Sequence, residues 1–550
     1  MTRQAAVCLA VLLTAAALVG TGPAAAFAPS RPTDGLPETT GADGTVPRIH
    51  AVYPNPVADG DRGEYVTLSV PPGTDLGQYA LGDDERTVPL PNVTASGRVV
   101  LSTAPNATAN LTDRRVLAIP DGLELANGGE PLVLRRNGTA VDRLNYTDAP
   151  EGERRVRGRG DRWRPLGATD RPVVTGHADE VRVFTLPDPP EVATDTLAEA
   201  DRRILFAGYT FTDSAVADEL VAAAERNVPV RVLVDGDPVG GMARQQADIL
   251  DRLAAAGIDV RVLGGERARY EFHHAKYAVV DDSALVATEN WKHAGLGGNG
   301  SRGWGVITDQ PRVVRGLAET FRADAGWRDA RPWTAYSAGE TFESAPAANA
   351  TYPTQFRPET VPVEETHLLV APDNAEARIL DILGNATESI DIEQVSLGGR
   401  QQPFVQASLA AARRGVDVRI LLSGAWYAEE ENRRLVAWLN ERAAREGLPL
   451  EARLAKPRGD FEKIHAKGVV VDGDQAVLGS LNWNNNSARD NREVVLVLDG
   501  EAVGAYYGRV FDADWPVPPP LPASVAVAVV LAALLAVRVG ARLDFEPPAD

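Results

Sequence analysis

Two copies of the spacing His-x-Lys-x4-Asp contain the residues of this sequence that are best suited to chemistry. The copies are His274/Lys276/Asp281 and His465/Lys467/Asp472. Histidine titrates close to neutral pH, so it can act as a nucleophile or carry a proton, and a lysine ammonium can bind phosphate oxygens. The pattern therefore predicts phosphodiester chemistry built on this pair of motifs, with the lysines neutralising the substrate.

Each copy is followed by a second polar segment. These segments read Ala287-Thr288-Glu-Asn290-Trp291 and Gly479-Ser480-Leu-Asn482-Trp483. If each His-x-Lys segment is extended, the alternation of side chains along a strand puts the histidine and the lysine on one side. A single copy is weak support for a function, but two copies with matching downstream segments are specific.

The elements around the motifs form an internal repeat. Each repeat is predicted to contain a buried strand, a helix, a second strand, a longer helix, a third strand and a strand that follows the histidine. The predicted elements with matching positions are 204–209 and 390–394, 216–226 and 405–414, 230–234 and 418–422, 260–263 and 450–454, and 278–280 and 468–471. Strands that alternate with helices indicate an α/β fold with a mostly parallel sheet covered by helices. We expect two such halves, 175–335 and 363–515, joined by a linker at 336–362.

Over about residues 175–515 the sequence resembles the phospholipase D superfamily. The resemblance implies that two tandem α/β halves pack face to face as a pseudo-dimer and that their motifs form one site. It implies that one histidine attacks phosphorus to form a phosphohistidine intermediate. The other histidine would protonate the leaving oxygen and then activate water or an alcohol. The sequence leaves open which of His274 and His465 is the nucleophile.

The resemblance also gives roles to the polar residues near the histidines. The residues implied to hold the substrate phosphate, or to assist, are Lys276, Lys467, Asn290, Asn482, Thr288 and Ser480. Asp281 and Asp472 complete the catalytic motifs, and we expect them to support the fold of the site without contacting substrate. Because the lysines can neutralise a phosphodiester, we expect neither a metal nor another cofactor.

The two halves differ in one supporting residue. In this family an acid helps to orient a histidine, and the resemblance gives that role to Glu493 in Asp490-Asn-Arg-Glu493. The matching first-half position, in Arg302-Gly303-Trp304, is a glycine. We therefore predict an active but asymmetric site in which the first half lacks the acid. A degenerate, non-catalytic site is the alternative.

Residues 46–157 are predicted to form a separate all-β domain. Strand-like runs at 64–70, 98–102, 115–119 and 131–135 are separated by turn residues, and this spacing is typical of a β-sandwich. The stretches Ile49-His-Ala-Val-Tyr-Pro-Asn-Pro56, Gly63-Glu-Tyr-Val66 and Leu81-Gly-Asp-Asp84 resemble a lamin tail domain. That resemblance implies an immunoglobulin-like accessory module without a catalytic group.

The charge balance of the 550-residue chain is acidic and poor in lysine. Acidic residues number 76 against 56 basic residues, the net charge is −20, and only five of the basic residues are lysines. A dense carboxylate surface keeps a protein hydrated in molar salt, so the composition is similar to that of proteins from extreme halophiles. A high-GC genome that favours arginine is the alternative. Two of the five lysines lie in the motifs, which supports a chemical need for them.

Both ends of the chain carry apolar segments. Residues 1–26 are predicted to be a cleaved signal peptide, with a retained N-terminal anchor as the alternative. Residues 27–45 form a predicted linker. Residues 521–540 are predicted to be a transmembrane anchor, because an apolar run is followed by Arg538 and Arg542. A helix packed on the domain is the alternative there. The only cysteine, Cys8, falls in the signal peptide.

Together these features predict an enzyme that is secreted, anchored in a membrane and active on its outer face. Phospholipids are the favoured substrates, because an anchor keeps the site near a lipid surface. An extracellular nuclease is the first alternative, although a chain of net charge −20 binds polyanions poorly at low salt. A non-catalytic surface-binding protein is the second alternative. The sequence indicates no protein partner.

Overall fold

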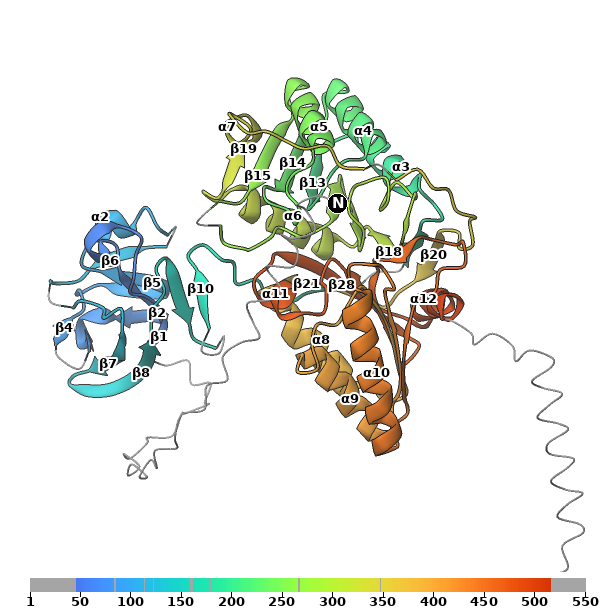
Figure 1. Ribbon diagram of the computed structural model, residues 1–550. Coiled ribbons are helices and arrows are strands. Elements are labelled where there is room, and N and C mark those ends of the chain that lie inside the picture. Colours follow the sequence, from blue (N-terminus) through green and yellow to red (C-terminus); the bar gives the residue numbers. More distant parts are fainter. Residues whose placement is uncertain are drawn as a thin grey trace, which may run out of the picture.

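The computed structural model describes residues 46–515, apart from 84–85, 113, 122, 159–161, 178–179, 266–267 and 347. The predicted signal peptide, the linker at 27–45 and the predicted span at 521–540 lie outside the described residues. Among the residues that are described, no helix is both long enough and apolar enough to cross a membrane. The described chain forms an N-terminal β unit followed by two α/β halves (Figure 1).

The N-terminal β unit consists of two sheets that enclose one apolar core. The first sheet has the order β10-β9-β1-β2-β5-β6 and the second the order β4-β3-β7-β8. Ile49 and Leu68 of the first sheet and Leu81 and Leu132 of the second lie in the same core. The strands are β1 Arg48–Tyr53, β2 Tyr65–Asp75, β3 Tyr79–Gly82, β4 Thr87–Pro89, β5 Thr94–Ser102, β6 Val116–Ala118, β7 Gly129–Arg136, β8 Thr139–Thr147, β9 Glu153–Val156 and β10 Trp163–Pro165, with a short helix α2 Pro105–Thr108. The four predicted strand runs are confirmed, and the lamin-tail and immunoglobulin-like assignments stay predictions.

The first α/β half is built on a sheet with the order β19-β15-β14-β13-β16-β17-β18-β12-β20. The strands are β12 Glu180–Leu186, β13 Ile204–Gly208, β14 Val230–Asp235, β15 Asp259–Leu263, β16 Tyr277–Val280, β17 Ser283–Ala287, β18 Ser301–Thr308, β19 Ala330–Pro332 and β20 Glu359–Pro362. The helices are α3 Val192–Ala198, α4 Ser214–Glu225, α5 Arg244–Ala255, α6 Pro311–Ala325 and α7 Trp333–Tyr336. β13 is a continuous apolar run that is buried along its whole length, as expected of a strand covered on both faces.

The second half repeats this arrangement in a sheet with the order β11-β21-β28-β27-β26-β22-β23-β24. The strands are β11 Val174–His177, β21 Glu365–Ala371, β22 Ser389–Gln394, β23 Asp417–Leu422, β24 Leu450–Leu454, β26 Lys467–Val471, β27 Gln475–Gly479 and β28 Glu493–Asp499, and β25 Lys463–Ile464 pairs with β18. The helices are α8 Ala375–Asn385, α9 Pro403–Arg414, α10 Glu429–Glu446, α11 Asn485–Arg489 and α12 Glu501–Asp514. α9 and α10 end at glycines with left-handed backbones, Gly415 and Gly447, which close the helices without a Cβ clash.

The prediction of mostly parallel sheets is wrong. Within each half the parallel pairs are those among the three strands joined by helices, which are β13, β14 and β15 in the first and β22, β23 and β24 in the second. Between the halves, β18 also pairs in parallel with the short strand β25. The strand inside each motif, β16 or β26, pairs antiparallel with the next strand. A connection of two or three residues between strands permits only antiparallel pairing, and such a connection follows both β16 and β26.

The two halves are joined by exchanged strands and a shared core. β11 pairs with β21 of the second sheet, and β20, from the predicted linker, pairs with β12 of the first sheet. α6 and α12 lie between the sheets and contribute Phe321 and Phe511 to one core that contains residues of both halves. Trp304 stacks on Tyr507 with ring centres 4.5 Å apart. The interface between the halves is therefore as well packed as a domain core.

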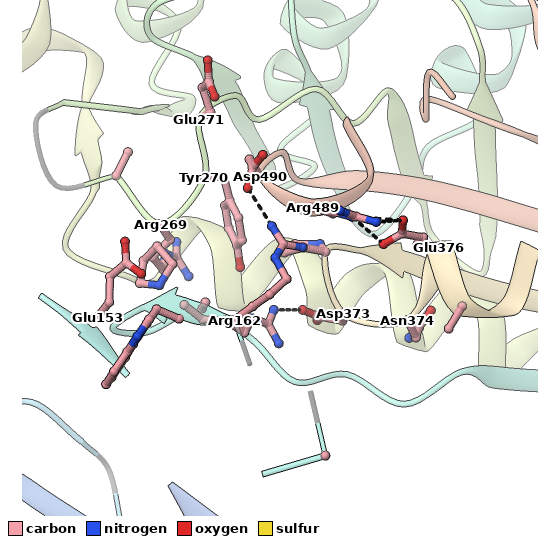
Figure 2. Close-up of a pocket in the computed structure, with 18 residues that line it drawn as sticks. Glu153, Arg162, Arg269, Tyr270, Glu271, Asp373, Asn374, Glu376, Arg489 and Asp490 are labelled. Carbon is pink, nitrogen blue, oxygen red and sulfur yellow. Dashed lines mark hydrogen bonds and ion pairs between the residues drawn. The ribbon is translucent and has the colours of Figure 1, made fainter. Parts of the chain in front are cut away.

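A cavity of about 490 Å³ marks the junction between the β unit and the α/β halves (Figure 2). Its arginines are paired with carboxylates, for example Arg162 with Asp490 at 3.1 Å and Arg489 with Glu376 at 2.6 Å. None of the residues predicted for the active site lines this cavity. The cavity therefore belongs to the attachment of the β unit and not to the motif chemistry.

Candidate active site

Backbone pairing between the halves brings the two motif histidines to one interface. The His465 N–H donates to the Arg302 carbonyl at 2.9 Å, next to the point where β25 pairs with β18. In the other half the His274 N–H donates to the Arg492 carbonyl at 2.9 Å. Each histidine is thus fixed by a segment of the opposite half. The structure brings together the two histidines that the sequence analysis paired.

His274 is held by an acid from the second half. Both oxygens of Glu493 lie close to His274 Nδ1, at 3.0 and 2.9 Å, and the Tyr209 ring packs edge-on with ring centres 4.6 Å apart. Burial lowers the pKa of His274 to about 4, although Glu493 opposes that shift. Burial favours the neutral form of Glu493, but His274 and Lys276 overcome it and lower the pKa of this acid. The ionised Glu493 therefore accepts from Nδ1–H, and the Nε2 lone pair of His274 stays free.

His465 also has an acid partner from the opposite half, which the sequence analysis missed. Glu289 Oε2 lies 3.2 Å from His465 Nδ1, and the glutamate is buried. Burial raises the pKa of Glu289 to about 7, although Lys467 and Lys292 oppose the rise. Burial, together with Lys467 and Lys276, lowers the pKa of His465 well below its usual value. The prediction that the first half lacks a supporting acid is therefore wrong.

The two acids occupy different positions in their repeats. Glu493 begins β28, and the strand register puts Gly303 of β18 at the equivalent position. A Cβ on Gly303 would lie only 2.3 Å from Glu289 Cγ, so the Glu289 side chain fills the space that a side chain at 303 would need. The second half has Leu481 where the first has Glu289. The sequence contained a signal for this difference. The first half has Glu289 and Gly303 at the two positions where the second half has Leu481 and Glu493.

The two motif lysines are buried beside the histidines. Lys467 Nζ lies 2.7 Å from the His465 carbonyl, 3.2 Å from the Thr288 carbonyl and 3.2 Å from His465 Nδ1. Lys276 Nζ donates to the His274 carbonyl in the equivalent way. Burial lowers the pKa of Lys467 to about 8 and lowers that of Lys276 well below its usual value. Two buried ammonium groups are expected to attract an anion to the histidines.

The four polar residues downstream of the motifs also lie in this region. Thr288 Oγ1 accepts from a backbone N–H of β18 at 3.0 Å, and Ser480 Oγ accepts from a backbone N–H of β28 at 2.9 Å. Both hydroxyls therefore tie their segments to the neighbouring strand. Asn290 Oδ1 is buried and has no hydrogen-bond partner among the described residues, and Asn482 is half-buried. The role of these side chains in holding phosphate oxygens stays a prediction.

The two motif aspartates are separated from the histidines by the strands β16 and β26. Asp281 accepts N–H groups from residues 201–203, and Asp472 accepts N–H groups from residues 387–389. These hydrogen bonds lower the pKa of both carboxyls even though burial opposes the shift. Both aspartates stabilise turns, with φ angles of 53° and 51°. They support the fold, as the sequence analysis expected, and their place in the catalytic motifs stays a prediction.

Two fully buried arginines position the segments next to the histidines, and the sequence analysis did not identify them. Arg302 pairs with two aspartates at 2.7 and 3.3 Å, and Arg492 pairs with two others at 3.0 and 3.5 Å. The aspartates are Asp514, Asp188, Asp324 and Asp373. Because the carbonyls of these arginines accept from the histidine N–H groups, the ion pairs fix the backbone that holds both histidines.

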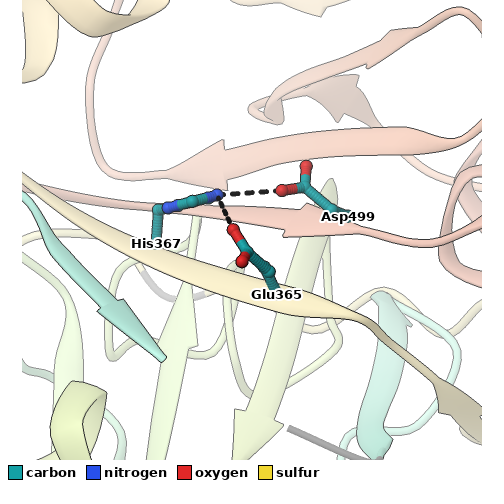
Figure 3. Close-up of side chains that lie close together, drawn as sticks. All are labelled: Glu365, His367 and Asp499. Atoms are coloured by element: carbon teal, nitrogen blue, oxygen red, sulfur yellow. Dashed lines mark hydrogen bonds and ion pairs between the residues drawn. The ribbon is translucent and has the colours of Figure 1, made fainter. Parts of the chain in front are cut away.

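Glu365, His367 and Asp499 form a separate cluster of metal-binding residue types, with donor atoms within 4.8 Å of one another (Figure 3). His367 Nε2 lies 2.8 Å from Asp499, and its Nδ1 lies 2.9 Å from Thr175 Oγ1. Both ring nitrogens thus have protein partners. Asp499 and Glu493 occupy opposite ends of β28, about 20 Å apart at ~3.3 Å per residue. The cluster is therefore not part of the histidine site.

Comparison with known proteins agrees with the repeat. The sequence model of the family described as "Cardiolipin synthase, PLD-like domain" matches residues 194–325 and 379–515. The two matched segments contain one motif each. Cardiolipin synthase A of Yersinia pseudotuberculosis and that of Yersinia pestis are each 31% identical over 109 residues, which are 20% of this chain and 21% of those proteins. The match thus spans about a fifth of the length of these curated relatives.

Among solved structures, phosphatidylserine synthase from Haemophilus influenzae Rd KW20 matches with a TM-score of 0.47 and 14% identity, over 60% of this chain and 84% of that chain. Nuc from Salmonella typhimurium matches with a TM-score of 0.25 and 22% identity, over 28% of this chain and 96% of that chain.

Proposed function

We propose that the two α/β halves, both of which match a PLD-like domain, belong to the phospholipase D superfamily, and that the chain is a phosphodiesterase that acts through a phosphohistidine intermediate. The observation that carries the proposal is the pair of histidines at one interface, each beside a carboxylate from the other half. A covalent intermediate divides one difficult displacement into two easier ones. Hydrolysis and transfer to an alcohol share this intermediate and differ only in the second nucleophile.

His274 is the proposed nucleophile. Its Nδ1–H is engaged by the ionised Glu493, and its pKa of about 4 keeps the imidazole neutral near pH 7. In the first step Nε2 attacks phosphorus, and the bond from phosphorus to the leaving oxygen breaks with its electron pair on that oxygen. His465 supplies the proton to the leaving oxygen. In the second step His465 takes a proton from water or an alcohol, whose oxygen displaces His274.

His465 is the proposed acid and base because its Nδ1 has a different partner. The ammonium of Lys467 has three close acceptors, two carbonyls and His465 Nδ1, which match its three N–H bonds. Nδ1 therefore accepts a hydrogen bond, and the imidazole proton is on Nε2. A bound phosphodiester anion favours a second proton on this histidine. Glu289, with a pKa of about 7, lies 3.2 Å away and can provide it.

Phospholipids are the proposed substrates. Four of the five lysines lie close enough to the site for their charges to favour the ionised form of Glu289. They are Lys276, Lys292, Lys463 and Lys467. Positive charge is thus concentrated where one phosphodiester group binds, while the net charge of −20 disfavours an extended polyanion at low salt. The name of the cardiolipin synthase relatives supports lipid chemistry. A nuclease of the same superfamily is the second candidate.

The proposed location is the outer face of a membrane. It rests on the predicted signal peptide at 1–26 and the predicted anchor at 521–540, both outside the described residues. The β unit is proposed to be a lamin-tail-like accessory module, and its two sheets around one core are compatible with an immunoglobulin-like sandwich. The lysine-poor, acidic composition supports the proposal that the enzyme is active in high salt.

The first experiment measures hydrolysis of bis(p-nitrophenyl) phosphate by the full chain with EDTA present, at low and at molar salt. We expect activity, and we expect His274→Ala and His465→Ala each to abolish steady turnover. His177→Ala is the matched control, because that side chain is 81% exposed and belongs to neither motif. Turnover that persists in either active-site variant would refute the two-histidine mechanism. Plasmid DNA and extracted phospholipid, assayed side by side, decide the substrate class.

A trapping experiment separates the two histidines. A p-nitrophenolate leaving group needs little help from an acid, so His465→Ala should still form the phosphoenzyme but hydrolyse it slowly. Mass spectrometry of the digested protein should then find the phosphoryl group on His274. Phosphoryl groups on His465 in the His274→Ala variant would reverse the assignment.

A further inference from the structure

The exposed large apolar side chains of the described chain are Val239, Trp426 and Tyr427, with 80%, 87% and 48% of their surface exposed. They lie in two equivalent loops of the internal repeat, 236–243 after β14 and 423–428 after β23. Both loops leave the carboxyl ends of parallel strands, which lie at the same edge of each sheet as the site. Trp426 and Tyr427 contact each other, and a contiguous exposed apolar patch marks a surface for interaction.

The first loop is connected directly to His274. The Val239 N–H donates to Tyr209 Oη at 2.6 Å. The Tyr209 ring in turn packs against the His274 imidazole, and Lys276 Nζ lies 5.3 Å from the centre of that ring. Val239 is therefore separated from the proposed nucleophile by one tyrosine side chain.

The second loop is connected to His465. The Tyr427 ring centre lies 5.9 Å from Lys463 Nζ, two residues before His465. Burial of the phenol, with the nearby carboxylates of Glu289 and Glu462, raises the pKa of Tyr427 to about 12. The Tyr427 ring thus lies on the His465 side of the site, while Trp426 packs edge-on against that ring and is otherwise exposed. The two loops border the site on the sides of its two histidines.

We propose that Val239, Trp426 and Tyr427 form a docking rim that inserts into the interfacial region of a lipid membrane and places the site over lipid phosphates. The inference rests on the proposed function and gives it a physical route to a substrate embedded in a surface. Tryptophan and tyrosine favour the membrane interface, where an apolar body and a polar edge are both satisfied. Insertion of apolar groups needs no net positive charge, so it suits a chain of net charge −20.

A lipid surface explains the rim better than a nucleic acid does. Nucleobases also stack on exposed aromatic rings, but binding of a strand depends on a basic groove along its backbone. The lysines here are concentrated at the site itself, and exposed arginines elsewhere are commonly paired with carboxylates, as in Arg413–Glu446 and Arg434–Glu430. Valine, in addition, offers no ring for stacking.

The test places one fluorophore on the rim of the full chain. Cys8 is the only cysteine, so Cys8→Ser combined with Trp426→Cys gives a single labelling site. Asp474→Cys in the same background is the control, because Asp474 is exposed at the turn after β26, at the opposite end of that strand from Lys467. Both proteins are reconstituted into phospholipid vesicles that contain doxyl-labelled lipid. The rim label should be quenched strongly and the control label weakly.

A kinetic comparison provides the second measurement. Trp426→Ala and Val239→Asp should each lower the rate on vesicle phospholipid about tenfold, since the burial of one large apolar side chain corresponds to at least a tenfold change in partitioning. Their rates on bis(p-nitrophenyl) phosphate should equal that of the parent, and Trp426→Phe should retain most of the vesicle rate.

Equal quenching of the two labels, or an equal loss on both substrates, would overturn the docking rim. A rim label that responds to single-stranded DNA and not to lipid would also overturn it, in favour of base stacking. If the parent hydrolyses no phosphodiester, the proposed function fails, and the quenching comparison still decides whether the rim enters the lipid.

Discussion

Replacement of Glu289 tests the unusual position of the acid beside His465. The glutamate is buried, its Oε2 lies 3.2 Å from His465 Nδ1, and its Cγ occupies the space above Gly303. We expect Glu289→Ala to leave the fold intact and to slow turnover. The reason is that His465 would lose the group that orients its ring and supplies its second proton.

The expected size follows from the contact. A hydrogen bond to a charged group contributes about 1.5–3 kcal/mol, and each 1.4 kcal/mol changes a rate about tenfold. Glu289→Ala should therefore lower kcat roughly ten- to hundredfold. The loss should be larger for an alkyl leaving group than for p-nitrophenolate, because only the alkoxide needs a proton from His465. A purely structural role of Glu289 would slow both substrates equally.

Two matched variants test the space that Glu289 shares with Gly303, and the second moves the acid to the position that it has in the second half. Gly303→Ala alone should displace Glu289, reduce activity and cost about 1–3 kcal/mol of stability through overpacking. Glu289→Ala combined with Gly303→Glu removes the clash and supplies a carboxylate from β18, so it should recover part of the lost rate. Steady-state kinetics and urea denaturation of all four proteins give both quantities. Parental kcat in Glu289→Ala would refute the reasoning, as would a double variant no better than the worse single one.

Three further outcomes are expected. The acidic limb of the pH profile of kcat/KM should follow His274, because burial lowers the pKa of this histidine to about 4. Activity should therefore persist near pH 5, where an ordinary histidine with a pKa of about 6.5 is mostly protonated. An acidic limb near pH 6.5 would contradict this assignment. Asp472→Asn should lower stability by about 1–2 kcal/mol through its hydrogen bonds to residues 387–389 and leave the rate on bis(p-nitrophenyl) phosphate unchanged. Because the folded pKa of Asp472 is lowered, its contribution is present above the pKa of the unfolded chain and is lost as pH falls through the folded value, which denaturation at several pH values would detect. Lys467→Arg should lose activity at least tenfold by the same assay, and a fully active arginine variant would show that the geometry of the ammonium is unimportant.

Local patterns in the sequence were sufficient to predict much of the fold. The strands β13, β14 and β15 and their counterparts appear as short apolar runs between helices, and the paired motifs identified both histidines. The prediction of parallel sheets failed because alternation of strands and helices describes only β13 to β15. The turns at Asp281 and Asp472, where the motif strands reverse direction, determine the antiparallel pairing of β16 with β17 and of β26 with β27.

The partners of the histidines depend on contacts that are remote in sequence. Glu289 and His465 are 176 positions apart, and their contact follows only from the way the halves face each other. The sequence comparison matched Gly303 with Glu493 correctly, but it could not show that a neighbouring side chain occupies the space left by the glycine. The pairings of β11 and β20 are equally nonlocal, because β11 precedes the first half's sheet strands but joins the second sheet, and β20, from the predicted linker, returns to the first sheet.

The asymmetry of the two halves also explains why this chain keeps lysine in its motifs while arginine supplies nearly all its other cations. Lys467 directs its ammonium toward three acceptors, the carbonyls of His465 and Thr288 and the Nδ1 of His465. A tetrahedral ammonium can satisfy three acceptors that converge on one point, whereas the planar guanidinium of arginine spreads its donors over a fork. One of those acceptors is the ring nitrogen that determines the tautomer of His465. The same lysine therefore neutralises substrate charge and places the proton of His465 on Nε2, while Glu493 leaves the Nε2 of His274 unprotonated. In the proposed mechanism, the two chemically identical histidines thereby receive opposite roles from the groups behind them.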